Sequence, residues 1–112
     1  MEEKNLLKNI DKKSVLVLKD QIEYQKGQVV SKTLVQNEKV GITLFSFEKG
    51  EEISAHSSHG DAFVNCLDGV GRITIDDEEF LLHEGEAIIM PAEHPHAVYA
   101  VERFKMLLTV VF

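Results

Sequence analysis

The chain has 112 residues, 44% of them hydrophobic, which suits one small globular domain with a single core. Its 12 lysines and arginines against 19 aspartates and glutamates give a net charge of −7, and no basic cluster is interleaved with aromatic residues, so we expect no nucleic-acid partner. The charged N-terminus precedes no apolar run, and no segment approaches the roughly 18 apolar residues of a membrane span. We therefore expect a cytoplasmic protein that does not contact membranes.

Short apolar segments separated by turn residues run through the chain. Residues 3–10 have the spacing of one short helical turn. Asp68-Gly69 is a hairpin signal that would separate two strands. Strands are expected at residues 15–18, 29–35, 40–47, 53–56, 62–67, 71–75, 80–83, 87–90, 97–101 and 104–112. Some ten short strands without a long helix predict an all-β fold, either an antiparallel sandwich or a barrel.

Cys66 is the single cysteine, so no disulfide can form within the chain. It lies in the middle of an apolar strand, where burial as a small hydrophobic side chain is expected. Burial raises a thiol pKa and suppresses nucleophilicity, which argues against catalysis by this residue.

Two segments of one pattern, a glycine followed after five residues by an anchor residue, stand out in the second half of the chain. Gly50 with His56 and Gly85 with Pro91 follow this pattern, which resembles the two sequence motifs of the cupin family. Six residues are in register with those motifs: Gly50, His56, Gly69, Gly85, Pro91 and His96. The resemblance covers about residues 29–112 and implies a double-stranded β-helix, a jelly-roll barrel with an open mouth. It predicts one domain over residues 1–112, with its motif region at 50–100 and N-terminal strands at 15–47.

Four positions depart from the family's motifs. Ser58 stands in place of the second histidine, Ala62 in place of the glutamate, Glu93 in place of a glycine and Ala100 in place of the asparagine. Only two of the usual four metal ligands, both histidines, are therefore retained.

Side chains alternate along strands, which decides what faces the barrel interior. In the family register His56 and His96 face inward, and Ala62, Val64 and Cys66 line the interior on another strand. The expected interior is mostly apolar with two imidazoles near the mouth. Such an interior suits a pocket for a small ligand with few oriented polar groups.

A tight metal site needs three or four protein ligands, so two imidazoles require a further ligand. His59 is the expected one, because the glycine after it would allow the loop to bend and turn this ring back toward His56. Asp61 and His94 are the alternatives. The predicted site is therefore a divalent ion, Zn²⁺, Ni²⁺, Fe²⁺ or Mn²⁺, held by His56, His59 and His96.

Three functions stay open at this point. The resemblance to cupins allows a metal-dependent dioxygenase, isomerase, epimerase or decarboxylase, whose ion would polarise a substrate oxygen, water or O₂. A binding or sensing module without metal would instead use His56 and His96 as hydrogen-bond donors to a carboxylate or a sugar. A third possibility is an interaction scaffold. No general base is evident, because the family's inward glutamate is Ala62 here, and the sequence assigns no reaction.

The two ends of the chain carry more apolar residues than one small barrel needs. They lie at residues 15–18 and 104–112, and open strand edges there invite pairing or coverage. We therefore expect a homodimer, which is also the state that the resemblance to cupins implies.

Overall fold

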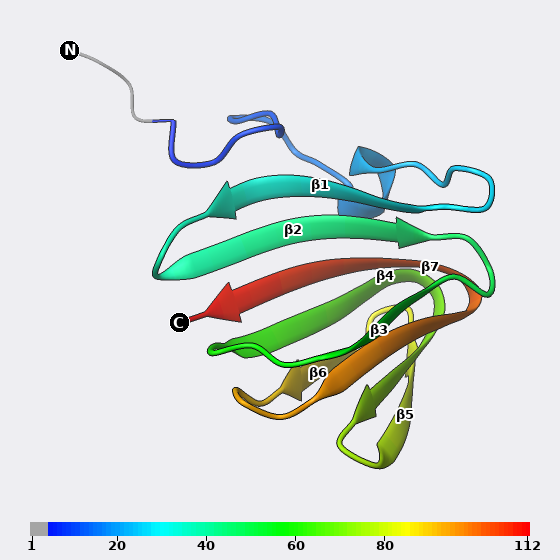
Figure 1. The fold of residues 1–112 in the computed structure, drawn as a ribbon. Coiled ribbons are helices and arrows are strands. Elements are labelled where there is room, and N and C mark those ends of the chain that lie inside the picture. The colour runs from blue at the N-terminus through cyan, green and yellow to red at the C-terminus, as the bar shows by residue number, and fades with distance from the viewer. Residues whose placement is uncertain (1–4) are drawn as a thin grey trace.

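The computed structural model describes residues 5–112, which form seven strands and one short 3₁₀ helix (Figure 1). These elements are η1 Leu18–Gln21, β1 Val29–Gln36, β2 Val40–Phe47, β3 Glu52–His56, β4 Asp61–Ile75, β5 Glu78–His83, β6 Ala87–Met90 and β7 His96–Val111. The expected all-β fold is confirmed. Two details near the N-terminus were wrong: residues 15–17 form no strand, and residues 5–10 contain no helical turn. Residues 3 and 4 of that turn lie outside the described range. Within residues 5–112, no helix has both the length and the apolar character needed to cross a membrane.

All seven strands belong to one antiparallel sheet in the order β1-β2-β7-β4-β5, with β3 paired to β7 and β6 paired to β4. The two longest strands, β4 and β7, pair with each other along most of their length. Each of them joins two strands expected to be separate, because residues 62–67 and 71–75 form β4 and residues 97–101 and 104–111 belong to β7. In Figure 1 the sheet curves, so that β3, β5 and β6 lie on the opposite side of β4 and β7 from β1 and β2.

The Asp68-Gly69 pair does not form the expected hairpin. It lies inside β4 as an irregularity, because the register against β7 shifts between Cys66 and Asp68 and again between Gly69 and Gly71. Gly69 has φ +75°, and a Cβ there would clash with the carbonyl oxygen of Arg103. Glycine is thus required by the close approach of two backbones, and the bulge bends the strand without ending it.

The inner face of the curved sheet packs into one apolar core. As the alternation along β4 and β7 predicts, Ala62, Val64 and Cys66 are buried there together with Val98 and Ala100. The other buried members are Phe47, Ile73, Leu82, Met90, Phe104 and Met106. Burial raises the pKa of the Cys66 thiol to about 11, so the thiol stays protonated near neutral pH. The expectation of a buried cysteine is confirmed.

The outer face of the sheet is covered in part by residues 5–28, which we call the N-terminal segment. Ile22 is buried against this face together with Leu34 and Leu44, and Ile10, Val30, Ile42, Leu67 and Leu107 pack around them. Polar contacts also hold the segment. The Lys32 ammonium donates to the carbonyl oxygen of Gln21 at 3.0 Å, and the Lys105 ammonium donates to that of Lys19. These two lysines of the sheet therefore hold η1 against it through hydrogen bonds to the backbone of the helix.

Candidate functional site

The structure brings His56 and His96 together at one end of the barrel. In the pairing of β3 with β7 the two residues lie opposite each other, and their ring centroids are 4.4 Å apart with an interplanar angle of 68°. The His96 side chain is buried, whereas His56 is exposed. The pair therefore lies where the edge of the apolar core meets solvent.

A bulge in β3 makes this pairing possible. Ile53 pairs with Val98 and His56 pairs with His96, so three residues along β3 match two along β7. In a regular strand, side chains three residues apart point to opposite faces. The extra residue brings both Ile53 and His56 to the face that carries Val98 and His96. The sequence predicted the inward direction of His56 only through the cupin register.

The hydrogen bonds of the two rings define their tautomers. His56 Nδ1 lies 3.0 Å from the carbonyl oxygen of Ser54, and His96 Nδ1 lies 3.2 Å from that of His94. A carbonyl oxygen only accepts, so each Nδ1 carries the hydrogen and donates it. Each neutral ring then has a lone pair on Nε2, and no hydrogen bond from residues 5–112 occupies either of these atoms. The site therefore offers two acceptor nitrogens.

The electrostatics of the site favour a neutral His96 ring. The pKa of His96 is lowered, mainly because burial disfavours the charged ring and further because of the charge on His56, while the bond to the His94 carbonyl opposes these effects. His96 is therefore neutral near pH 7. Protonating both rings at once is disfavoured, since they are in contact.

The three candidates for a further metal ligand are each bonded to another group. His59 Nδ1 lies 2.7 Å from Glu93 Oε1, and its side chain is 91% exposed. His94 Nδ1 lies 2.8 Å from Asp76 Oδ2, and Asp61 accepts a hydrogen bond from a backbone amide of the β6–β7 loop. Among residues 5–112 there is no group of three or more His, Cys, Asp or Glu side chains that could hold a metal ion. The structure thus places His59 apart from the His56–His96 pair.

Sequence reasoning missed the two carboxylates that bind these loop histidines. Glu93 and Asp76 both have positive φ, 67° and 53°, the left-handed region that few residues other than glycine adopt readily. The signal at Glu93 was its position, because the cupin motif has a glycine there. Its carboxylate then fixes the His59 ring through Nδ1.

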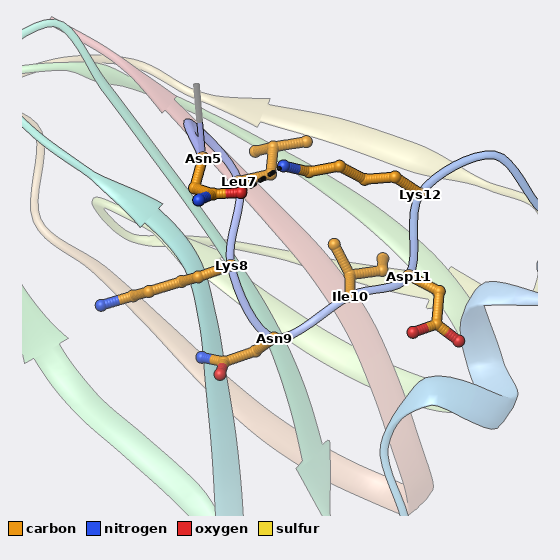
Figure 2. Close-up of a pocket in the computed structure, with 7 residues that line it drawn as sticks. All are labelled: Asn5, Leu7, Lys8, Asn9, Ile10, Asp11 and Lys12. Atoms are coloured by element: carbon orange, nitrogen blue, oxygen red, sulfur yellow. Dashed lines mark hydrogen bonds between the residues drawn. The ribbon is translucent and has the colours of Figure 1, made fainter. Parts of the chain in front are cut away.

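Two surface hollows lie away from the histidine pair. One of about 380 Å³ is formed by the loop at residues 5–12, where Lys12 Nζ bonds Asn5 Oδ1 at 3.2 Å (Figure 2). The other, of about 300 Å³, lies between the N-terminal segment and the β5–β6 turn and includes Val17, Leu67 and Gly85. Neither hollow is lined by a histidine. The candidate site is the His56–His96 pair, where the two histidines in register with the cupin motifs meet.

Comparison with known proteins identifies the family. The sequence matches the cupin domain model over residues 43–112. A conserved protein of unknown function from Streptococcus pyogenes is 48% identical, with 98% of this chain and 96% of that chain covered and a TM-score of 0.96. A cupin superfamily protein from Desulfitobacterium hafniense is 37% identical, with coverage of 95% and 97% and a TM-score of 0.90.

A cupin 2 conserved barrel domain protein from Leptotrichia buccalis is 43% identical with a TM-score of 0.82, and the match covers 84% of this chain and 46% of that one. No match was found among curated proteins. The family model covers more than half of the chain, and the Streptococcus and Desulfitobacterium structures match 98% and 95% of it. The chain therefore belongs to the cupin family, and its curved antiparallel sheet is a cupin barrel.

Proposed function

We propose that this cupin binds a small hydroxyl-bearing organic molecule, such as a sugar or polyol, at the His56–His96 pair. The observation that carries the proposal is the shared tautomer of the two rings. Both Nδ1 atoms donate to backbone carbonyls, which leaves two neighbouring Nε2 acceptors. A hydroxyl group donates a hydrogen bond to such a nitrogen without any change of protonation. The pair can therefore orient a polyhydroxylated ligand.

A neutral ligand fits the charges of the site better than an anion does. A carboxylate would need an imidazolium partner, and the pKa of His96 is lowered by burial and by His56. The chain also carries a net charge of −7, which repels anions at long range. Further inward along β7, Val98 and Ala100 are buried and apolar. Both belong to the packed core, so the ligand would lie at the edge of the core beside the exposed His56 ring.

The proposal concerns binding and assigns no reaction. Ala62 is buried on the inner face, at the position where the family motif has a glutamate. Its methyl group can neither accept nor deliver a proton. A role as a binding or sensing module therefore follows more directly from these residues than an enzymatic role.

A divalent metal ion is the second candidate, and the same tautomers favour it. Metal-bound histidines commonly donate their other ring N–H to a carbonyl or carboxylate, as His56 and His96 do. Two imidazoles nevertheless do not fit a tight site, which needs three or four protein ligands. His59 belongs to no group of three such donors in the described residues, so its loop would have to move toward the pair. The ion would otherwise depend on donors from water or from an organic ligand.

Nuclear magnetic resonance of protein with ¹⁵N-labelled histidines tests the main candidate. At about pH 7.5, the ring signals of His56 and His96 should report the Nδ1–H tautomer. They should shift on addition of monosaccharides or polyols, and less on addition of small carboxylates. His96→Phe should abolish the response, whereas the exposed control His83→Phe should retain it. A wild-type protein whose ring signals respond to none of the hydroxyl compounds would contradict the proposal.

Calorimetry with Zn²⁺ and Ni²⁺ tests the metal candidate. We compare the wild type with His56→Ala, His96→Ala and His59→Ala. Weak binding that disappears in the first two variants and persists in the third agrees with a site of two imidazoles. Tight one-to-one binding that all three variants abolish would instead establish the three-histidine site, and would overturn the preference for a metal-free ligand site.

A further inference from the structure

The strand register places four side chains in one row across the sheet, at the end that carries the histidine pair. His56 lies opposite His96 in the pairing of β3 with β7. Ile75 of β4 lies opposite His96 on one side and opposite Glu78 of β5 on the other. Residues directly opposite each other point to the same face of a sheet. The row therefore runs from two imidazoles, over an isoleucine, to a carboxylate.

The neighbours of Glu78 show that it points to the inner face. Leu82, four residues further along β5, is buried in the core, and residues at an even separation share a face of a strand. Glu79 points the other way, and its carboxylate lies 3.5 Å from Nε of Arg72. Two adjacent carboxylates are thus on opposite sides of the sheet, and only Glu78 belongs to the row of the histidine pair.

The turn beside Glu78 is held by the loop that precedes His96. The backbone amide of Asp76 donates to the carbonyl oxygen of Pro95 at 2.9 Å, and the Asp76 carboxylate lies 2.8 Å from Nδ1 of His94. These contacts fix the start of β5 relative to the start of β7. A ligand that touches both strands therefore does not have to order this turn when it binds.

The Glu78 carboxylate is available to a ligand. Glu78 is exposed, and among residues 5–112 no hydrogen bond or ion pair engages its carboxylate. Glu93 and Asp76, by contrast, are each bonded to a loop histidine. Phe80, the next residue of β5 on the inner face, is 38% exposed. Glu78 thus adds a free negative charge to a surface that is otherwise apolar between β5 and the imidazoles.

The charge of the chain is unevenly distributed along the sequence. Residues 50–101 form β3 to β6 and the first part of β7, and they contain 11 acidic residues and one basic residue. With neutral histidines this stretch has a formal charge of −10, whereas the rest of the chain, with eight acidic and 11 basic residues, has +3. A positively charged ligand is therefore attracted toward the strands that carry the histidine pair.

We propose that Glu78 selects a ligand with an ammonium group, so that the molecule bound at the His56–His96 pair is an amino sugar or a similar amino polyol. The inference rests on the proposed function, because the two imidazoles bind the hydroxyl end of the ligand. The Glu78 carboxylate accepts hydrogen bonds from the ammonium, and a bond between charged groups is stronger than one between neutral groups. The carbon atoms between the two ends lie over Ile75.

The spacing of the row limits the size of the ligand. Neighbouring strands are about 4.8 Å apart, so Glu78 is about 10 Å from His96 along the row. Two hydrogen bonds of about 2.9 Å each occupy part of this distance and leave about 4 Å between the hydroxyl and the ammonium. Groups on adjacent carbons are too close together for this. Groups on opposite sides of a sugar ring fit.

Titration of the ¹⁵N-histidine-labelled protein at about pH 7.5 and low salt tests the inference. The probes are 6-amino-6-deoxyglucose, whose amine is charged at this pH as that of lysine is, and glucose, which has a hydroxyl in its place. Both should shift the ring signals of His56 and His96. The amino sugar should bind about two- to fivefold more tightly, as expected of an exposed charge pair, and added salt should reduce this ratio.

Glu78→Gln removes the charge and keeps the shape of the side chain. It should bring the two affinities together and leave the affinity for glucose unchanged. The matched control is Glu79→Gln, which changes the net charge by the same amount but lies on the outer face, and it should keep the preference. Glu78→Lys should make glucose the tighter ligand of the two.

The outcomes separate this inference from the proposed function. A wild type that responds to neither probe would contradict both. Equal affinity of the wild type for the two sugars, or a preference that Glu78→Gln retains, would overturn only the role of Glu78, because the histidine pair would still bind hydroxyl groups. Circular dichroism checks the fold of each variant, and Glu78→Ala replaces any glutamine variant that does not fold, with the same expected loss of preference.

Discussion

The two faces of the same sheet are buried in different ways. The side chains of the inner face are buried against one another, because the curved sheet brings them together in one core. The outer face depends on the N-terminal segment, which adds Ile10 and Ile22 and is fastened by the Lys32 and Lys105 ammonium groups. Phe63 and Ile89 on the same face remain exposed, so the N-terminal segment does not cover them. The comparison shows that alternation determines which side chains share a face, whereas the cover of a face depends on segments elsewhere in the chain.

Removing a large side chain from the inner face should have the largest effect. Phe104 is fully buried, and its ring packs against Phe47 with centroids 5.5 Å apart. Phe104→Ala should lower the free energy of unfolding by about 3–5 kcal/mol, because it loses the transfer energy of the ring and leaves a cavity. Urea denaturation measures this loss. Leu81→Ala on β5 is the exposed control and should cost less than about 1 kcal/mol. A similar loss in both variants would show that Phe104 does not anchor the core.

A smaller and more local effect is expected on the outer face. Ile22→Ala should cost about 2–3 kcal/mol, since Ile22 is buried between the N-terminal segment and the sheet. Hydrogen exchange should then accelerate at the amide of Lys8, which donates to the Leu34 carbonyl. The amides that join β4 to β7 should keep their protection. Equal acceleration at all these amides would mean that the segment and the barrel unfold as one unit.

The smallest expected effect is a pH dependence from His96. Its folded pKa is lowered by burial and by His56, so below about pH 6.5 the unfolded chain binds more protons than the folded one. Its contribution to stability is therefore complete above that pH and is lost as the pH falls through the folded pKa, at no more than about 1.4 kcal/mol per pH unit. Urea denaturation of the wild type, His96→Phe and the control His83→Phe should show the smaller slope in His96→Phe alone. An unchanged slope in that variant would assign the dependence to other groups.

Much of the fold was predictable, because the apolar residues and the turn residues that mark a strand are close together in the sequence. The bounds of β2 and β6 agree with the predicted residues 40–47 and 87–90, where apolar residues run between turn signals. Asp68-Gly69 was wrongly predicted to be a hairpin turn, because hairpin turns and bulges both use a residue with positive φ. Only the pairing of β4 with β7 distinguishes a bulge from a turn here. Residues 15–17 have the composition of a strand, but they pair with no strand in the described chain.

The candidate site was predictable where strand register positions it. His56 and His96 are opposite each other on paired strands, and the motif spacing indicated their common position. His59 lies in a loop, where its orientation depends on which partner it meets. That partner is Glu93, 34 residues away, and local sequence carries no information about such a contact. The dimer and the bound ligand stay predictions for the same reason, since both concern groups outside one chain.

The long strand β7 has a consequence for synthesis of the protein. Residues 96–111 pair with β2, β3 and β4. The β1–β2 pair, β3 and the group of β4, β5 and β6 are therefore joined to one another through β7, which follows all of them in the chain. During translation, the apolar faces of β2 and β4 therefore stay exposed until residues 96–111 leave the ribosome. The barrel can close only after release of this segment from the exit tunnel. We expect nascent chains stalled before residue 96 to depend on chaperones.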